Sequence, residues 1–316
     1  MDKSTPLVSI VINSYDQAPY LEQTIQSVLQ QDYPNLEILL VDGGSMDGSL
    51  EIIERFSDRF AWWVSEKDSG QAEGINKGLN RAKGELVAWL NSDDYYLPGA
   101  VSHAVDQWRS HPDAVLIYGD VVAVDEHGKA MNMMPTGNWQ LRDLMEFKII
   151  NQPAVFMKRD ALAVSGYLDL NYHYLLDHHL WLRIVCQGKM VHAHETWAAG
   201  RFHAAAKNVA SAASFGEEAY RMVDWMKQTV PFDTITGVRW NRITAGAHRI
   251  NARYLLDAGN PTASLKAYWR GWLAYPPAVL PESHRMLYAL LSLAGLGSLK
   301  RLYYSLRRLV RPVKMD

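Results

Sequence analysis

Residues 36–48 read Leu-Glu-Ile-Leu-Leu-Val-Asp-Gly-Gly-Ser-Met-Asp-Gly. The run before Asp42 is short and almost wholly apolar, which is typical of a strand buried on both faces of a parallel sheet. Two glycines follow at once and predict a tight turn into the next element. Ligands of such sheets bind beyond the carboxyl ends of the strands. This stretch therefore predicts an α/β sheet with a ligand site at the turn after Asp42.

The same alternation continues on both sides of this stretch. Strand patterns cover 7–13, 61–65 and 85–90, and helical spacing covers 17–30, 48–56 and 70–82. Alternating strands and helices with short links predict a doubly wound, Rossmann-like sheet for residues 1–97. Polar residues follow each strand, so we expect an acidic edge formed by Asp42, Asp68, Asp93 and Asp94.

Two further parts follow. Residues 98–214 mix strands (114–124, 154–158 and 191–202) with helices (98–110, 139–146 and 175–187) and a hairpin turn at 126–128, and we expect them to extend the sheet and cover the site. From residue 215 the pattern is helical, with a stop and restart at Gly259-Asn260-Pro261. We therefore predict one α/β domain at 1–214, made of two halves (1–97 and 98–214), and a helical region at 215–316.

Composition excludes several classes of protein. Hydrophobic residues make up 48% of the 316 residues and charged residues 21%, as in a folded chain with a sizeable core. The formal net charge of −2 gives no overall attraction to nucleic acid. A lone cysteine, Cys186, cannot form an intramolecular disulfide, and the N-terminus has no signal-peptide pattern, so we predict a cytoplasmic setting.

The C-terminal end is basic and amphipathic. The 14 uncharged residues between Arg285 and Lys300 are too few to cross a bilayer. The segment that follows interleaves cations with apolar residues, which predicts either a packed helix with a solvated face or a peripheral contact with the inner face of an anionic membrane. Its cations are Lys300, Arg301, Arg307, Arg308, Arg311 and Lys314.

Four motifs, in this order, resemble the family 2 glycosyltransferases, which have the GT-A fold. They are Val8 to Tyr15, Ile38 to Gly48, Asp68 to Gly78 and Gly84 to Asp94, and the resemblance covers about 7 to 205. It implies a GT-A domain that binds a nucleoside-diphosphate sugar. The nucleotide contacts that it implies are Asn13, Tyr15, Asp42, Gly43, Asp68, Asn76 and Lys77.

A strand-end carboxylate such as Asp42 can accept a hydrogen bond from the N3–H of uracil or thymine, which favours a UDP- or dTDP-sugar and leaves GDP open. The alternative is structural: Gly43 and Gly44 form a turn, and Asp47 caps the next helix. Asp68 has the same two interpretations, as a contact to base or ribose or as a helix cap.

Residues 91–94, Asn-Ser-Asp-Asp, stand in the place of the family's DxD motif. By that resemblance Asp93 holds Mn²⁺ or Mg²⁺ between the two phosphates, because hard cations prefer carboxylate and phosphate oxygens. Asn91, in place of the first Asp, would reach the ribose through its amide, beside Ser92. The alternative is that Asp93 or Asp94 caps the helix predicted from residue 98.

The segment Arg201-Phe202-His203 resembles an Arg-x-His element at the end of the family's catalytic domain. It implies that His203 completes the metal shell and that Arg201 meets phosphate. Asn151-Gln152-Pro153 resembles the acceptor-side loop, with Gln152 as a contact to sugar or acceptor. A zinc site from the nearby strand histidines is the weaker hypothesis, because such histidines are more often structural.

The segment Asp177 to Arg183 resembles the family's acidic base motif followed by a Leu-Trp-Leu-Arg helix, and it implies that Asp177 deprotonates the acceptor hydroxyl. Leu176 and His179 replace residues that are often acidic there. We therefore predict an inverting, metal-dependent glycosyltransferase that acts on a glycan or lipid-linked glycan in cell-surface polysaccharide synthesis. The alternative is a sugar-nucleotide or glycan-binding module with an idle base, whereas a dinucleotide oxidoreductase is excluded because no GxGxxG is present.

Overall fold

The computed structural model describes residues 5–134, 136–203, 211, 214–235 and 237–296. The chain divides into two compact units. The first unit comprises Met1–Leu141 and Ile149–Arg201, and the second comprises Arg142–Lys148 and Phe202–Asp316. The basic C-terminal segment predicted from the sequence lies outside the described residues.

The first unit is an α/β structure. Its elements, in chain order, are β1 (Val8–Ser14), α1 (Ala18–Leu29), β2 (Leu36–Asp42), α2 (Ser49–Arg55), η1 (Ser57–Arg59), β3 (Trp62–Ser65), α3 (Gln71–Leu79), β4 (Leu86–Asn91), β5 (Tyr95–Tyr96), α4 (Ala100–Ser110), β6 (Ala114–Val124), β7 (Ala130–Met134), η2 (Gln152–Ala154), β8 (Val155–Lys158), α6 (Arg159–Ser165), α7 (Leu176–Val185) and β9 (Lys189–Arg201).

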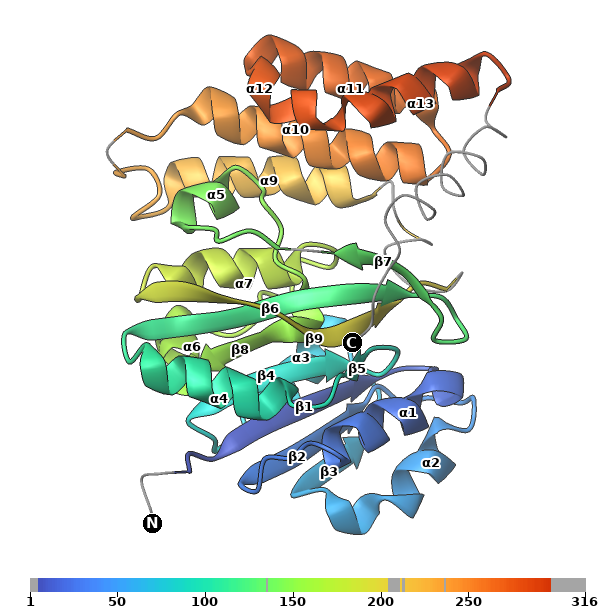
Figure 1. Cartoon of the computed structure of the whole chain (residues 1–316), viewed down its shortest axis with the longest axis vertical. Helices are drawn as coiled ribbons and strands as arrows, with labels where there is room; N and C mark the ends of the chain where they lie inside the picture. Colours follow the sequence, from blue (N-terminus) through green and yellow to red (C-terminus); the bar gives the residue numbers. More distant parts are fainter. Residues whose placement is uncertain (1–4, 135, 204–210, 212–213, 236, 297–316) are drawn as a thin grey trace. The chain divides into compact units, whose positions relative to one another are not determined.

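One sheet runs through this unit in the order β3-β2-β1-β4-β8-β6-β9-β5, with β7 paired to β6 (Figure 1). The first four strands are parallel, as predicted, and β8 joins them antiparallel to β4. The parallel register places Ser14 opposite Asp42 and Asn13 opposite Asn91. The polar strand ends therefore meet at one edge. The pairing of β8, β6 and β9 beyond β4 confirms that the mixed half extends the sheet.

Both faces of this sheet are covered by helices, which explains why its central strands are apolar throughout. Val8, Ile10 and Ile12 of β1 share a core cluster with the apolar faces of α1 and α4. The alternate residue Val11 faces α3, since a Cβ added at Gly78 of that helix would lie 2.3 Å from Cγ1 of Val11. In Figure 1, α1 and α4 lie in front of the strands, and α3 and α7 lie behind.

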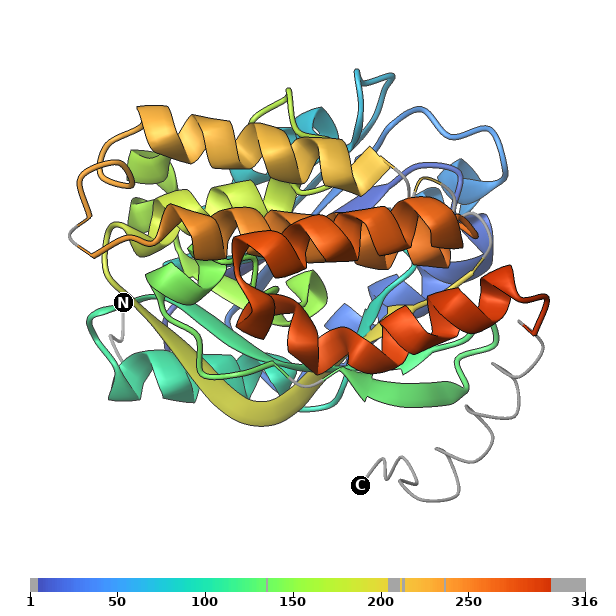
Figure 2. The ribbon, with the colours of Figure 1, turned by 90° about the horizontal axis from the view of Figure 1, so that it is seen from above.

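The second unit is helical. It contains α5 (Leu141–Met145) apart from its first residue, α9 (Phe215–Gln228), α10 (Trp240–Asp257), α11 (Pro261–Ala274), α12 (Pro276–Val279), η4 (Leu280–Glu282) and α13 (Ser283–Leu293). Figure 2 shows α9, α10 and α11 side by side. The buried Arg249 of α10 donates to the carbonyls of Glu146 and Phe147, which ties the segment around α5 to these helices.

Membrane-spanning helices were sought among the described residues, and none of their helices combines the required length with the required apolarity. The helical hairpin predicted around residues 259–261 is confirmed as α10 and α11, with Asn260 accepting a hydrogen bond from the backbone N–H of Ala263 as the cap. α6 was not predicted, because seven residues are too few for a helical period to stand out.

Packing of α3 against β1 gives a test of this fold. Replacing Gly78 by alanine favours a helix by about 1 kcal/mol, but the new methyl overlaps Val11 and should cost about 1–3 kcal/mol. We therefore expect Gly78→Ala to lower the free energy of unfolding, measured by urea denaturation. In the Val11→Ala background the same change should be neutral or stabilising. Additive effects in the double variant would contradict this packing.

Candidate functional site

The turn after β2 is organised by Asp42, whose side chain is fully buried. Its Oδ2 accepts hydrogen bonds from the backbone N–H groups of Gly44 (3.1 Å) and Ser45 (2.9 Å) and from the hydroxyl of Ser65 (2.7 Å). Its Oδ1 accepts from the hydroxyl of Ser45. Asp42 therefore shapes the turn that Gly43 and Gly44 form, and its contact with a nucleotide base stays a prediction.

Asp68 lies close to the backbone at this edge. A Cβ at Gly43 would be 2.9 Å from its Oδ2, and one at Gly74 would be 2.8 Å from the same oxygen and 2.7 Å from Oδ1 of Asn13. Only glycine allows this close approach. Burial raises the pKa of Asp68, against the lowering effects of the Gly70 N–H and Lys77. The half-buried carboxylate and the Asn13 amide thus form one polar cluster over the glycine backbone.

Tyr15 lies beside this cluster, because a Cβ at Gly43 would also meet its ring at 3.1 Å. Its side chain is 61% exposed, which is unusual for a tyrosine next to a glycine turn. Asp47, at the end of the turn, accepts hydrogen bonds from the N–H groups of Ala18 and Ser49 and so stabilises the starts of α1 and α2. An exposed aromatic ring beside a polar cluster is suited to stacking on a planar ligand.

Two predicted contacts on α3 have protein partners. The side-chain amide of Asn76 donates to the carbonyl of Leu168 (2.8 Å) and accepts from its N–H (3.0 Å). Asn76 therefore ties α3 to the loop after α6, and its contact with a nucleotide stays a prediction. Lys77 forms ion pairs with Glu66 (3.0 Å) and Glu73 (3.3 Å), which hold its ammonium group beside the edge.

Three amide side chains form a chain at the end of β4. Gln71 donates to Oδ1 of Asn91 (2.8 Å), Asn91 donates to Oε1 of Gln152 (3.1 Å), and Gln152 donates to the carbonyl of Trp89 (2.8 Å). The structure thus brings together two predicted site residues, Asn91 and Gln152, that are 61 positions apart. Gln71 was not predicted, and only its place at the start of α3 pointed to it.

The loop after β4 carries two adjacent carboxylates. Asp94 is buried, and its pKa is raised well above the ordinary value by burial and by the charge of Asp93. Its Oδ1 accepts a hydrogen bond from the backbone N–H of Arg201 (2.9 Å). Asp93 is half-buried. The neutral form of the Asp94 carboxyl is therefore favoured by its surroundings.

Thr24 of α1 fixes the backbone of this loop. Its buried hydroxyl lies 2.8 Å from the carbonyl oxygen of Ser92 and 2.7 Å from that of Asp94. The N–H of Ser92 in turn donates to the carbonyl of Asn13 at the end of β1. Ser92 is buried. A polar residue on the apolar face of α1 was the only signal in the sequence for this role of Thr24.

Arg201 has a structural role that differs from the predicted phosphate contact. Its buried guanidinium donates to the carbonyls of Asp93, Asp125 and Glu126 and to Oε1 of Gln23. Its carbon also lies 4.7 Å from the centre of the Tyr20 ring and 5.6 Å from that of Tyr95. Because the protein occupies these donors, Arg201 joins the carboxylate loop to α1 and to the β6–β7 turn.

Asp177 is the second residue of α7 and is half-buried. The helix packs on β4 through stacked Trp89 and Trp181 rings, with 5.1 Å between ring centres, and Trp181 lies one helical turn after Asp177. The guanidinium of Arg183 donates to the carbonyls of residues 165–167, which fixes the same helix to the end of α6. Asp177 thus lies in the first turn of a helix that packs on β4 and is tied to the end of α6.

The remaining histidine predictions fall in different places. His203 belongs to the second unit, which begins again at Phe202. His192 is buried and bonds to Asp120 (2.9 Å) within the first unit, with the His194 ring beside it. Within the described ranges, no three His, Cys, Asp or Glu side chains gather into a metal-binding group. The zinc hypothesis gains no support from this arrangement.

Comparison with known sequences identifies relatives of the chain. Residues 9–158 match the model of glycosyl transferase family 2. The amylovoran biosynthesis glycosyltransferase AmsE of Erwinia amylovora is 30% identical over 193 residues, which cover 58% of this chain and 72% of AmsE. An uncharacterised glycosyltransferase of Rickettsia typhi is 25% identical over 207 residues, or 63% of this chain. That match spans 65% of the Rickettsia protein.

Solved structures share the fold. The 1–349 fragment of Staphylococcus aureus TarS superposes with a TM-score of 0.62 at 16% identity, covering 98% of this chain and 94% of that fragment. The same fragment is known in complex with UDP-GlcNAc. The mannosyltransferase PcManGT of Pyrobaculum calidifontis, in complex with GDP-Man and Mn²⁺, has a TM-score of 0.56 at 20% identity, covering 96% of this chain and 84% of that one. The predicted GT-A fold is confirmed.

The contacts of Arg201 predict how its replacement by lysine should behave. Lysine keeps the charge but cannot reach the carbonyl groups on three sides, so we expect Arg201→Lys to cost about 2–4 kcal/mol of stability. If the variant binds UDP more weakly than the wild-type chain does, it should bind uridine more weakly by the same factor, as measured by calorimetry. Arg59→Lys, at an exposed arginine after α2, is the matched control. A stable variant that loses UDP but keeps uridine would instead make Arg201 a phosphate ligand.

Proposed function

The chain belongs to glycosyltransferase family 2, and from that premise we propose that it transfers a sugar from a nucleoside-diphosphate sugar to a hydroxyl of a glycan or lipid-linked glycan. The observation that carries this proposal is the meeting of Asn13, Asp68 and the Asp93–Asp94 pair at the carboxyl edge of the parallel strands. Cell-surface polysaccharide synthesis is the setting we propose, because AmsE is named for the biosynthesis of amylovoran.

For the donor nucleotide we propose a site over the Gly43 turn. Tyr15 offers an exposed ring for stacking, and Asp68 and Asn13 offer acceptors and donors for base and ribose. Asp42 would act mainly through the turn that it holds, and Lys77 would place a positive charge near the edge. UDP- or dTDP-sugars remain our preferred donors and GDP-sugars remain open. The fold is shared with a UDP-GlcNAc complex and a GDP-Man complex.

For the metal we propose that Asp93 is the protein ligand, with Asp94 behind it. Two hard carboxylates at one strand end fit Mn²⁺ or Mg²⁺. Burial and the charge of Asp93 raise the pKa of Asp94, and a cation there would offset the second of these effects. When bound, such an ion supplies positive charge that stabilises the departing diphosphate. Thr24 and Arg201 hold the backbone of the loop, so Asp93 is fixed in position before ligand arrives. His203 stays a proposed additional ligand.

For the chemistry we propose one displacement at the anomeric carbon. Asp177 takes the proton of the acceptor hydroxyl as that oxygen forms its bond to the anomeric carbon. The bond from this carbon to the diphosphate oxygen breaks on the opposite side, and the electron pair leaves with the nucleoside diphosphate. One base without a protein nucleophile gives inversion of configuration. We take 1–214 as the catalytic domain and 215–316 as a helical region for acceptor-side or surface contacts.

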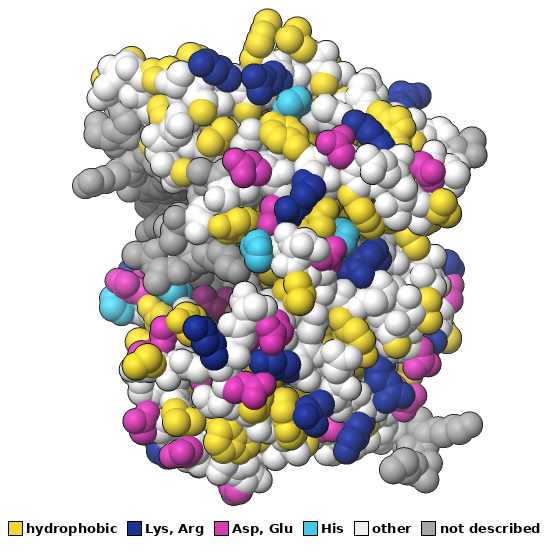
Figure 3. Space-filling model, turned by 180° about the vertical axis from the view of Figure 1, so that it is seen from behind, with side chains coloured by type: hydrophobic (Ala, Val, Ile, Leu, Met, Phe, Trp, Pro, Cys, Tyr) yellow, Lys and Arg dark blue, Asp and Glu magenta, His cyan; other side chains and the backbone are white. Residues whose placement is uncertain are grey.

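We further propose that the helical region contacts the inner face of an anionic membrane. The exposed stripe of α11 carries Lys266 and Arg270 beside Trp269, and α13 exposes Leu287 and Leu290. Figure 3 shows hydrophobic side chains interleaved with Lys and Arg in the part of the surface formed by the second unit's helices. Cations next to exposed aromatic and aliphatic groups are typical of interfacial contacts. The basic segment after Lys300 would add further charge.

Removing residues 301–316 tests this membrane contact. Each cation near an anionic surface contributes about 1 kcal/mol, so the truncated chain should bind anionic vesicles at least tenfold more weakly in co-sedimentation. Binding to neutral phosphatidylcholine vesicles should stay low for both chains. Unchanged binding to anionic vesicles after truncation would mean that this segment is not the contact.

Two aspartate variants test the proposed reaction together. With Asp177→Asn we expect turnover to fall by about 10²–10⁴, while a nucleotide still raises the melting temperature in the presence of Mn²⁺. With Asp93→Ala we expect the manganese-dependent part of that shift to disappear. The same melting measurement with UDP, dTDP, GDP and CMP, each with and without Mn²⁺, identifies the nucleotide of the sugar donor.

The matched control is Asp106→Ala, because Asp106 is an exposed carboxylate on α4, away from the strand ends. It should change neither the melting shift nor turnover. Full turnover in Asp177→Asn would remove the proposed base. If none of the four nucleotides raises the melting temperature, even with Mn²⁺ present, a different ligand would be favoured for this edge.

A further inference from the structure

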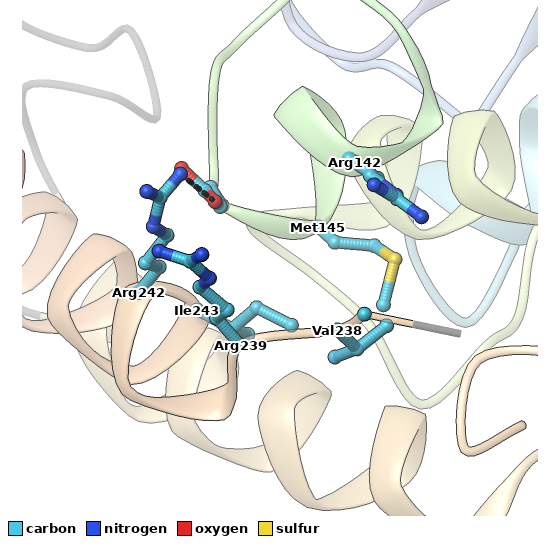
Figure 4. A pocket seen from close by; sticks show the side chains of 8 residues that line it. Arg142, Met145, Val238, Arg239, Arg242 and Ile243 are labelled. Atoms are coloured by element: carbon cyan, nitrogen blue, oxygen red, sulfur yellow. Dashed lines mark ion pairs between the residues drawn. The ribbon is translucent and has the colours of Figure 1, made fainter. Parts of the chain in front are cut away.

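The second unit contains a cavity of about 380 Å³ that the proposed sugar transfer does not use. Its walls come from three short segments: α5, the residues before α10, and the first turn of α10 (Figure 4). The lining residues are Arg142, Met145, Glu146, Gly237, Val238, Arg239, Arg242 and Ile243. The volume lies in the range of small-molecule sites.

The polar part of this lining is mainly cationic. The charged side chains of the lining are three arginines, Arg142, Arg239 and Arg242, and one carboxylate, that of Glu146. The ion pair in Figure 4 joins Arg242 to Glu146 at 3.8 Å, which is long for a pair that neutralises both groups. Arginines that gather at one cavity favour an anion with several acceptor oxygens, because each guanidinium presents donors in a planar fork.

The start of α10 adds to this positive potential. This helix has 18 residues, its N-cap Arg239 makes no side-chain capping bond, and its first turn contains no acidic residue. The N-terminal N–H groups of a helix favour negative charge. Arg242 also has a buried Nε–H that finds no acceptor among the described residues. An anion bound at this end of α10 would provide the acceptors that the protein here does not.

The rest of the lining is apolar. Met145 and Ile243 are buried, and Val238 lies beside them in the wall. A fully hydrated inorganic ion gains nothing from such a wall, whereas an ester with a carbon chain next to its charged group buries apolar surface there. The lining therefore matches an amphiphilic anion better than a bare one.

We propose that this cavity binds a phosphate group carried on an apolar body, such as a phosphorylated lipid headgroup or a small organic phosphate. The phosphate oxygens accept from Arg239, Arg242 and the first N–H groups of α10, and the apolar body lies against Met145 and Ile243. The site is separate in sequence from the strand ends of the first unit, and the proposal stands whether or not the chain transfers a sugar.

The experiment measures binding to the full chain by calorimetry with three soluble probes. They are dihexanoyl phosphatidic acid below its micelle concentration, dihexanoyl phosphatidylcholine with its zwitterionic headgroup, and inorganic phosphate. The test variant is Arg239→Gln with Arg242→Gln, and the matched control is Arg253→Gln, an exposed arginine further along α10. Arg239→Gln alone is included, because that side chain is exposed and its loss leaves the fold intact.

We expect phosphatidic acid to bind the wild-type chain and the Arg253→Gln control with equal affinity. Its affinity for the double variant should be at least tenfold lower, and its affinity for Arg239→Gln should also be lower than for the wild-type chain. Phosphatidylcholine should bind at least tenfold more weakly than phosphatidic acid. A tenfold preference for phosphatidic acid over inorganic phosphate supports the role of the apolar wall. Inorganic phosphate that binds as tightly as phosphatidic acid would overturn that role.

Three outcomes would overturn the proposal. They are no binding of either anionic probe, anion binding that Arg239→Gln and the double variant leave unchanged, and an equal loss in the Arg253→Gln control. The melting temperature and the nucleotide-dependent shift of each variant are measured alongside. An unchanged shift with lost phosphate binding separates this cavity from the nucleotide site.

Discussion

Strand β1 pairs with β2 on one side and with β4 on the other, and the candidate site depends on this parallel register. It sets Ser14 against Asp42 and Asn13 against Asn91, so three strands end at the same level. The glycine turn after β2 and the acidic loop after β4 then lie at one edge. A register change by one residue would turn each of these side chains to the opposite face of the sheet.

Several polar side chains at this edge form hydrogen bonds within the protein. Asp42 and Arg201 are buried and each makes several hydrogen bonds to loop backbone, and the buried Thr24 hydroxyl lies between two loop carbonyl groups. An unsatisfied polar group in such a place would be costly, so these bonds fix the loops in one arrangement. Tyr15 is exposed and Asp68 and Asp93 are half-buried, and these are the residues to which the proposed function assigns ligand contacts.

The near-neutral net charge of the chain conceals two opposite local fields. The first unit gathers carboxylates at its strand ends, where repulsion and burial raise the pKa of Asp94. The second unit gathers arginines around the start of α10. We propose a cation with a diphosphate for the first arrangement and a phosphate group for the second. Composition averages over both and therefore indicates neither site.

The sequence alone determined the family, the GT-A fold and the approximate bounds of most strands and helices, because apolar periodicity and turn glycines are local signals. It also placed Asn13, Asp68 and Asp93 at strand ends. Only the tertiary structure decided which polar residues act within the protein. Arg201 meets Gln23 across 178 positions, and Asn76 meets Leu168 across 92. Such partners are brought together by the sheet order, which no local pattern specifies. The arginine cavity has the same origin, since its walls are separated by about ninety residues and become neighbours only when α10 packs beside α5.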